Sequence, residues 1–480
     1  DGAKATRPAD PTNEGFTFVG WYKDAGLSEE FDFDTPVTSD ITLHAKWSKD
    51  AGKTFTVTFD SNGGSAVETQ AVAEGDVATR PADPEKAGSA FQEWTLDGET
   101  YDFSTPVTAD VTLVAFWRFV WDVTYVDGCG GEAFKDVAYS GILDGDATPS
   151  FDSGGKEPTR PGYLFAGWDP EVAKTVTANA TYTAKWDEVR ASVDGREYAS
   201  VSDAVAGAAD GATVSLASDS SEAVTIPEGK SVTLDLAGHT LTSDVDVLTV
   251  NGTLTISGDG VIASAKNKRA AVVNNGTLTV AGGTIRRDGE KGTEAGANGN
   301  SYYTVLNHGD MTVSGGSIEN SGGYSSCVSN GWYDGKQNAA KTPSTLTITG
   351  GSITGGLNTV KNDDWGVLRM TGGSVSGAAV CSIMNVNDAI ISGGSVTAGG
   401  KRMFANGWMD DDMDKGELSI TGGDFTLNGA ELLGVVGDAK KPGTFKVSGG
   451  TFDAEVDASH LADGCTQEKN DDGKWEVRSA

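Results

Sequence analysis

One short motif repeats through the second half of the chain: an apolar-x-apolar strand, a glycine-containing turn and a second short strand. The shortest spacing between successive Gly-Gly turns is about 21 residues, which is one coil of a parallel β-solenoid, and longer spacings accommodate loop insertions. This periodicity favours a stack of coils over any globular fold. The copies begin at Leu254, Leu278, Met311, Leu346, Leu368, Ala389, Leu418 and Phe445, with a degenerate copy at Val232.

A second register runs through the same coils, because an asparagine follows each apolar strand at a corresponding place. Asparagine tolerates left-handed backbone geometry, and its amide can bond to the amide of the next coil. We therefore predict a ladder of stacked asparagines at one corner. Its members are Asn251, Asn274, Asn307, Asn330, Asn362, Asn385 and Asn406.

The combination of coils and asparagine ladder resembles the right-handed β-helix of the pectin-lyase-like superfamily, which implies a right-handed parallel β-helix over residues 190–480. Apolar residues at helical spacing between Val201 and Ala209 predict a helix that caps the first coil. The segment CTQEKNDDGKWEVR, from Cys465, resembles the short hairpin that closes such helices. It would cover the last coil.

Residues 1–189 carry a different repeat, in which Thr-Arg-Pro is followed by an aromatic pair and then by a strand that ends in Trp. We expect three small modules, at 1–50, 51–119 and 120–189. The second and third open with an alternating strand, from Thr54 and Trp121, but the first does not. Because a sheet without its first strand exposes an unpaired edge, we expect the chain to be part of a longer protein.

The segment GFTFVGWYKDAGLSEEFDFDTPVTSDITLHAKW, from Gly15, closely resembles the Listeria-Bacteroides repeat, the internalin-type B repeat of bacterial surface proteins. The third module departs from it in the shortened DPEVAKTVTANATYTAKW and in an insertion from Ser140 to Lys156. The resemblance implies a β-grasp-like fold strung as a stalk in adhesins. The predicted fold class is all-β: tandem small β-grasp-like repeat modules followed by a right-handed parallel β-helix, with the Trp residues in the module cores.

Charge excludes some partners: 36 Lys or Arg against 69 Asp or Glu give a net charge of -33, which repels nucleic acid and anionic membranes. We find no apolar run long enough for a membrane helix and no signal peptide at DGAKATRPAD. We expect an extracellular monomer, anchored to the bacterial cell wall through segments outside this chain. The four cysteines are too scattered for a disulfide scaffold and are interpreted as buried thiols.

Acidic and basic residues gather in two insertions, as they do at the active sites of β-helix lyases and hydrolases. The family signatures of those enzymes do not occur here, so we assign no catalytic residues and expect a non-enzymatic protein. The alternative to catalysis is a set of solvated acidic loops. The residues concerned are Lys361, Asp363, Asp364 and Arg369, and then Arg402, Asp410, Asp411, Asp412 and Asp414.

The carboxylates of Asp410, Asp412 and Asp414 occupy alternate positions, as in a calcium loop. The glycine at Gly416 is one residue late for an EF-hand, and Thr421 stands where a bidentate Glu should be. An ordinary acidic insertion is the preferred reading, and Ca²⁺ is the only cofactor that the sequence suggests.

Three tryptophans follow ladder asparagines by two or three residues and should leave the coils near one corner. Indole rings presented in loops are typical of binding sites, and neighbouring carboxylates could accept hydroxyl hydrogen bonds. The alternative is that each ring packs its own insertion. The predicted site comprises Trp332, Tyr333, Asp334, Asp364, Trp365, Trp408 and Asp410.

From these features we expect a bacterial cell-surface, adhesin-like protein. A stalk of repeats would present a β-helix that binds a host or bacterial surface glycan or protein. Two alternatives remain: a polysaccharide-active lyase or hydrolase of the β-helix class, and a purely structural stalk.

Overall fold

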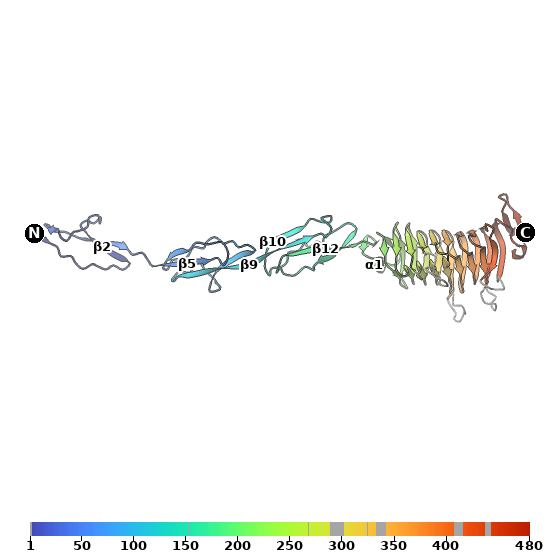
Figure 1. The fold of residues 1–480 in the computed structure, drawn as a ribbon, viewed down its shortest axis with the longest axis horizontal. Helices are drawn as coiled ribbons and strands as arrows, with labels where there is room; N and C mark the ends of the chain where they lie inside the picture. The colour runs from blue at the N-terminus through green and yellow to red at the C-terminus, as the bar shows by residue number, and fades with distance from the viewer. Residues whose placement is uncertain are drawn as a thin grey trace. The chain divides into compact units, whose positions relative to one another are not determined.

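The computed structural model (Figure 1) describes residues 2–152, 154–266, 268–288, 302–323, 325–332, 342–407, 416–436 and 443–480. The chain divides into two compact units, residues 1–158 with 167–185, and residues 159–166 with 186–480. Strands dominate both units, which confirms the all-β prediction. Within the described ranges, no helix combines the length and the apolar character needed to cross a membrane.

The first module (residues 2–50) contains two small antiparallel ladders. Strand β2 (Phe16–Tyr22) pairs with β4 (His44–Lys49), and a bulge interrupts the register between Phe18 and Gly20. The two-residue strands β1 (Ala3–Lys4) and β3 (Pro36–Val37) form the second ladder.

The second module (residues 51–119) has the same antiparallel pair and an additional strand. Here β7 (Ser89–Leu96) pairs with β9 (Val111–Val126), with a bulge at the matching place, between Phe91 and Glu93. On its other edge β9 pairs in parallel with β5 (Thr54–Asp60). Strands β6 (Gln70–Ala73) and β8 (Glu99–Thr100) complete the module, and its core is built around Trp94, which is 1% exposed.

The third module (residues 120–189) uses the second half of β9 as its opening strand, so one strand runs through the expected boundary at residue 119. This half pairs with β10 (Val137–Leu143) in antiparallel and with β12 (Ala180–Glu188) in parallel orientation. Strand β11 (Tyr163–Asp169) lies on the far edge of β12.

In the second unit, successive coils place equivalent strands side by side in parallel register (Figure 1). The coil repeat predicted from the sequence is thus confirmed: its copies form successive coils that stack on one another. A first set of strands is β15 (Ala212–Leu216), β18 (Ser231–Asp235), β21 (Thr253–Ser257), β24 (Thr277–Val280), β27 (Asp310–Val313), β30 (Ser344–Ile348), β33 (Gly366–Ser376), β35 (Asp388–Thr397), β37 (Glu417–Thr426) and β39 (Thr444–Phe452).

Two further sets complete the coils. One is β16 (Ser220–Ser221), β19 (Thr240–Thr242), β22 (Val261–Ser264), β25 (Thr284–Arg287), β28 (Ser317–Asn320) and β31 (Ser352–Gly355), continued by the later residues of β33, β35, β37 and β39. The other forms a separate parallel sheet of β17 (Val224–Ile226), β20 (Leu248–Val250), β23 (Val272–Asn274), β26 (Val305–Asn307), β29 (Val328–Asn330), β32 (Asn358–Asn362), β34 (Cys381–Asn385), β36 (Arg402–Asn406) and β38 (Glu431–Val435).

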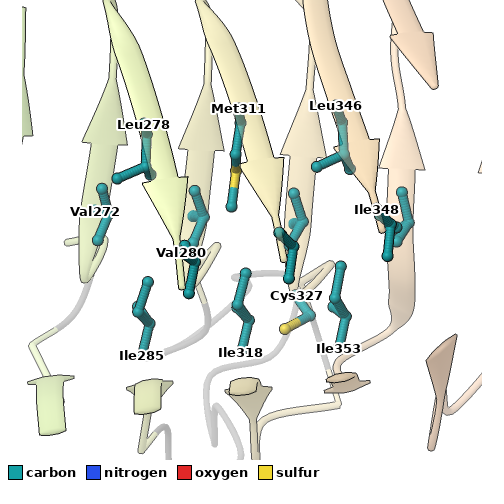
Figure 2. Packing of buried hydrophobic residues seen from close by; sticks show 14 of the residues in the cluster. Val272, Leu278, Val280, Ile285, Met311, Ile318, Cys327, Leu346, Ile348 and Ile353 are labelled. Carbon is teal, nitrogen blue, oxygen red and sulfur yellow. The ribbon is translucent and has the colours of Figure 1, made fainter. Parts of the chain in front are cut away.

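Apolar side chains at matching positions of successive coils fill the interior. Figure 2 shows Leu278, Met311 and Leu346 in line, with Ile285, Ile318 and Ile353 forming a second line. All six are at most 1% exposed. The period-2 pattern of each short strand therefore becomes a continuous core only when the coils stack.

The asparagine ladder forms from Asn274 to Asn406. Each Nδ2 donates to the Oδ1 of the next asparagine, at 2.7, 2.6, 2.7, 2.8 and 2.8 Å along the series. Asn251 was wrongly placed in this ladder, because Val250 is the residue in register with Asn274. Asn251 instead accepts a hydrogen bond from Asn275 in an exposed pair.

Both ends of the stack have the predicted caps. Helix α1 (Val201–Gly207) buries Val201, Ala204 and Val205 against the first coils, after a short hairpin of β13 (Ala191–Val193) and β14 (Arg196–Tyr198). At the other end, a 3₁₀ turn, η1 (Ala458–His460), leads into the antiparallel hairpin of β40 (Cys465–Lys469) and β41 (Trp475–Ser479), and β41 pairs with β39. The stack therefore ends on antiparallel strands at both termini.

All four cysteines are free thiols. Cys327 and Cys381 are buried, and burial raises the pKa of each to about 12. Cys129 and Cys465 are partly exposed, so the prediction of buried thiols was wrong for these two. Cys129 lies in a turn, where its Sγ donates to the Asp127 carboxylate at 3.0 Å.

Candidate binding surface

The corner that follows the asparagine ladder brings two of the predicted tryptophans into adjacent coils. Trp332 and Asp364 form an isolated bridge, in which the Trp332 amide donates to the Asp364 carbonyl at 2.8 Å. Trp365 has a left-handed backbone, with φ of 60°, and its carbonyl accepts from the Ser344 amide. Trp332 and Trp365 are both half-buried, and the third predicted ring, Trp408, lies outside the described residues.

Asp364 is not available in the way expected, because it is only 1% exposed. Its neighbour Asp363 is equally buried and forms an ion pair with Lys361, with 2.6 Å between Oδ2 and Nζ. Burial raises the pKa of Asp363 above its usual range, although the Lys361 ammonium acts in the opposite direction. These carboxylates face the interior of the corner rather than a ligand in solvent.

The remaining charged candidates also pair locally. The Arg369 guanidinium binds the Asp388 carboxylate of the next coil, and Arg402 donates to the Val435 carbonyl at 3.0 Å. The other predicted ligand and metal positions lie outside the described residues: Tyr333, Asp334, Trp408, Asp410, Asp412 and Asp414. Among the described residues, no three or more His, Cys, Asp or Glu side chains are grouped so that they could hold a metal ion.

The structure adds His308, which is not among the site residues predicted from the sequence. Its imidazole stacks face to face on the Trp332 indole, with 3.8 Å between ring centroids and an interplanar angle of 11°. A sequence signal existed, because His308 lies one residue after Asn307 and Trp332 lies two residues after Asn330, the next asparagine of the ladder. Residues that closely follow equivalent positions of adjacent coils lie near one another in a parallel stack.

This ring pair lines a pocket of about 540 Å³ on the surface of the stack. Exposed polar side chains surround the rings, including the Asp310 carboxylate and the Asn275 amide. Flat rings beside hydroxyl, amide and carboxylate groups can hold a ligand that has an apolar face and hydroxyl edges. The side chains that line the pocket are Asn275, Thr277, His308, Asp310, Trp332, Thr342 and Pro343.

Comparison with known proteins finds relatives for parts of the chain only. A Gly-rich membrane protein and a second membrane protein of Evansella cellulosilytica, both provisionally named, are 33% and 38% identical over 39% and 35% of this chain. Internalin H of Listeria monocytogenes is 36% identical over 20% of the chain. The matches span 22%, 26% and 18% of these relatives, so the chain corresponds to about a quarter of their length or less.

No solved structure matches the chain. The family model of the Listeria-Bacteroides repeat domain matches residues 1–46 and 55–116, that is, the first and second modules. The bulge that β2 and β7 share at the same place agrees with this assignment. The first two modules therefore match the Listeria-Bacteroides repeat domain, and the named relatives of parts of the chain are two membrane proteins and an internalin.

Proposed function

We propose that this chain is the adhesive part of a bacterial cell-surface protein, anchored to the cell wall by other segments. In this proposal the repeat modules form a stalk. The coils form a right-handed β-helix of the pectin-lyase-like type that binds a surface glycan or protein. The observation that carries the proposal is the pocket in which the indole of Trp332 and the imidazole of His308 stack among exposed polar groups.

The chemistry of the pocket favours a hydroxyl-rich ligand. A sugar ring has one face of C–H groups that can pack on an indole, and its hydroxyls can donate to the Asp310 carboxylate and the Asn275 amide oxygen. Asp310 and Asn275 are both exposed, so these hydrogen bonds form without burying an unpaired charge. We therefore favour a neutral glycan over an anionic one, which the carboxylate and the net charge of -33 would repel.

The geometry gives less support to an enzyme. Lys361 and Asp363 are an internal ion pair, and the Arg369–Asp388 pair joins two coils, so these groups are committed to partners within the fold. A purely structural stalk would need no pocket lined by exposed polar side chains.

A glycan array probed with the labelled chain tests the proposal, and Trp332→Ala should weaken the strongest binding at least about thirtyfold, as removal of a hot-spot indole does. Trp332→Phe, which keeps a ring, should retain most of the binding. Phe119→Ala is the matched control, because Phe119 is an aromatic residue 61% exposed in the other unit. Equal losses for the Phe119 and Trp332 variants would contradict the site, and release of sugar products by the wild type would favour the enzyme.

A further inference from the structure

One lysine of the coil stack lies in contact with a buried carboxyl group. The Lys361 side chain is 12% exposed, and its Nζ lies 2.6 Å from Oδ2 of Asp363, whose side chain is 1% exposed. Because a C–O bond of this kind is about 1.2 Å long, Nζ also lies within about 3.8 Å of the Asp363 carboxyl carbon. The nitrogen and the carbon are therefore close to the separation of about 3–3.5 Å from which bound groups react.

The adjacent coils surround this pair with uncharged residues. Lys361 is in register with Ser329 of one neighbouring coil and with Met384 of the other. Continued by two residues, the same register places Asp363 beside Val386, which is 2% exposed. Among the described residues, neither carboxyl oxygen of Asp363 receives a hydrogen bond of regular geometry. The surroundings therefore stabilise a charged carboxylate poorly.

Two features of the site favour the neutral form of the Asp363 carboxyl. Burial is the largest cause of its raised pKa, and the charge of Asp364 acts in the same direction, against the Lys361 ammonium. Asp364 is itself only 1% exposed. Loss of water from around an ion pair favours the uncharged form of both partners. In that form Lys361 is an amine and Asp363 is a carboxylic acid, which are the two groups that condense to an amide.

We propose that the side chains of Lys361 and Asp363 become joined by an amide bond. A proton first passes from the Lys361 ammonium to the Asp363 carboxylate. The nitrogen lone pair then attacks the carboxyl carbon, so that a C–N bond forms and the bond from that carbon to its hydroxyl group breaks. The hydroxyl leaves with one proton of the amine as water, and the reaction needs no oxidant, reductant or second substrate.

The amide bond closes a covalent ring across the corner that follows β32. The same corner holds the Trp332 amide on the Asp364 carbonyl at 2.8 Å and the left-handed backbone of Trp365. The bond replaces a buried ion pair, whose two charges are costly to keep away from water, by a neutral group. It needs no ligand, so the inference is independent of the proposed function.

Tryptic digestion of the whole denatured chain, followed by mass spectrometry, tests the proposal. Trypsin cleaves after a lysine with a free amine but not after one whose Nζ carries an acyl group. Most of the chain should therefore yield residues 342–369 as a single peptide, lighter by one water, in place of the peptides 342–361 and 362–369. Because the readout is the mass of the wild-type peptide, it does not depend on whether a variant folds.

The chain offers an internal control and a matched variant. The Lys266 Nζ lies 2.7 Å from the Asp244 carboxylate, but these side chains are 54% and 86% exposed, so trypsin should cleave after Lys266 as usual. Lys361→Met keeps the length of the side chain and removes the amine. It should give the peptide of residues 342–369 without the loss of water.

Three results would overturn the proposal. Full cleavage after Lys361 in the wild type, with unchanged peptide masses, would show that no bond forms. A peptide of residues 362–369 that is lighter by one water would assign the loss to an aspartate that has closed onto its own backbone. Loss of water from the Lys361→Met peptide, or the same resistance to trypsin at Lys266, would show that the buried amine is not the cause.

Discussion

The second module and the coil stack solve the same problem, burial of a β-sheet face, in different ways. The module gathers a few large rings from strands distant in the sequence, with Trp94 contacted by Phe59 and Phe91. The stack repeats one medium-sized side chain at one position, as in the line of Leu278, Met311 and Leu346 (Figure 2). The stability of a module therefore depends on each of its aromatic rings, whereas the stability of a coil depends mainly on its contacts with neighbouring coils.

The first and second modules sharpen the contrast, because they share a sequence pattern and differ in one strand. The same tryptophan position is 1% exposed where the strand is present and half-buried where it is not. The second module thus owes much of its core to its opening strand.

The largest effect is expected from Trp94→Ala, which should cost about 3–5 kcal/mol of the free energy of unfolding of the second module. Trp21→Ala is the matched variant and should cost less than about half as much, because Trp21 lacks the ring that Phe59 provides. Local unfolding free energies from hydrogen exchange would measure both. Equal costs would break the comparison between the two modules.

An intermediate effect is expected from Asn330→Ala, in the middle of the ladder. The change leaves the Asn307 amide without its 2.6 Å acceptor and the Asn362 carbonyl without its 2.7 Å donor, both in buried positions. The free energy of unfolding should fall by about 2–3 kcal/mol, since a buried polar group that loses its partner costs about 1–3 kcal/mol. Urea unfolding followed by circular dichroism measures it.

Asn275→Ala is the control for this experiment. Asn275 donates to Asn251 at 2.9 Å in an exposed pair, where water replaces the lost partner. Asn275→Ala should therefore lower the free energy of unfolding by less than about 0.5 kcal/mol. A cost similar to that of the Asn330 variant would mean that burial is not what makes the ladder important.

The smallest effect concerns Glu222, which caps helix α1. Burial raises the pKa of this carboxyl, but hydrogen bonds from the Val201 and Ser202 amides and from the Ser220 and Ser202 hydroxyls outweigh burial, so its pKa is lowered below 4.5 in the folded state. A lowered folded pKa means that the stabilisation is complete above pH 4.5 and is lost as the pH falls through the folded value.

Glu222→Gln should therefore destabilise the first coils by about 1 kcal/mol at pH 7 and by much less near pH 3. Free energies of unfolding measured at the two pH values give the difference. Glu228→Gln is the control, because Glu228 is an exposed residue of the same region. A cost that does not change with pH would mean that the charge of Glu222 is unimportant for the cap.

Local and periodic features could be predicted from the sequence. The coil repeat and the ladder from Asn274 onward follow from spacing along the chain, because parallel stacking brings equal positions together. The helix at Val201 follows from the helical spacing of its apolar residues, and the closing hairpin from Cys465 was predicted from its resemblance to the hairpins that end β-helices. The missing opening strand of the first module was likewise visible as an absent alternating segment.

Features that depend on contacts between coils, or on exact register, were decided only by the tertiary structure. The offset of Asn251 by one residue, the stack of His308 on Trp332 and the burial of Asp363 and Asp364 are of this kind. So is the continuity of β9 through two modules. The sequence identifies which residue types occupy a corner, but a one-residue shift in register reverses which of them face the interior, and only the packed coils fix that register.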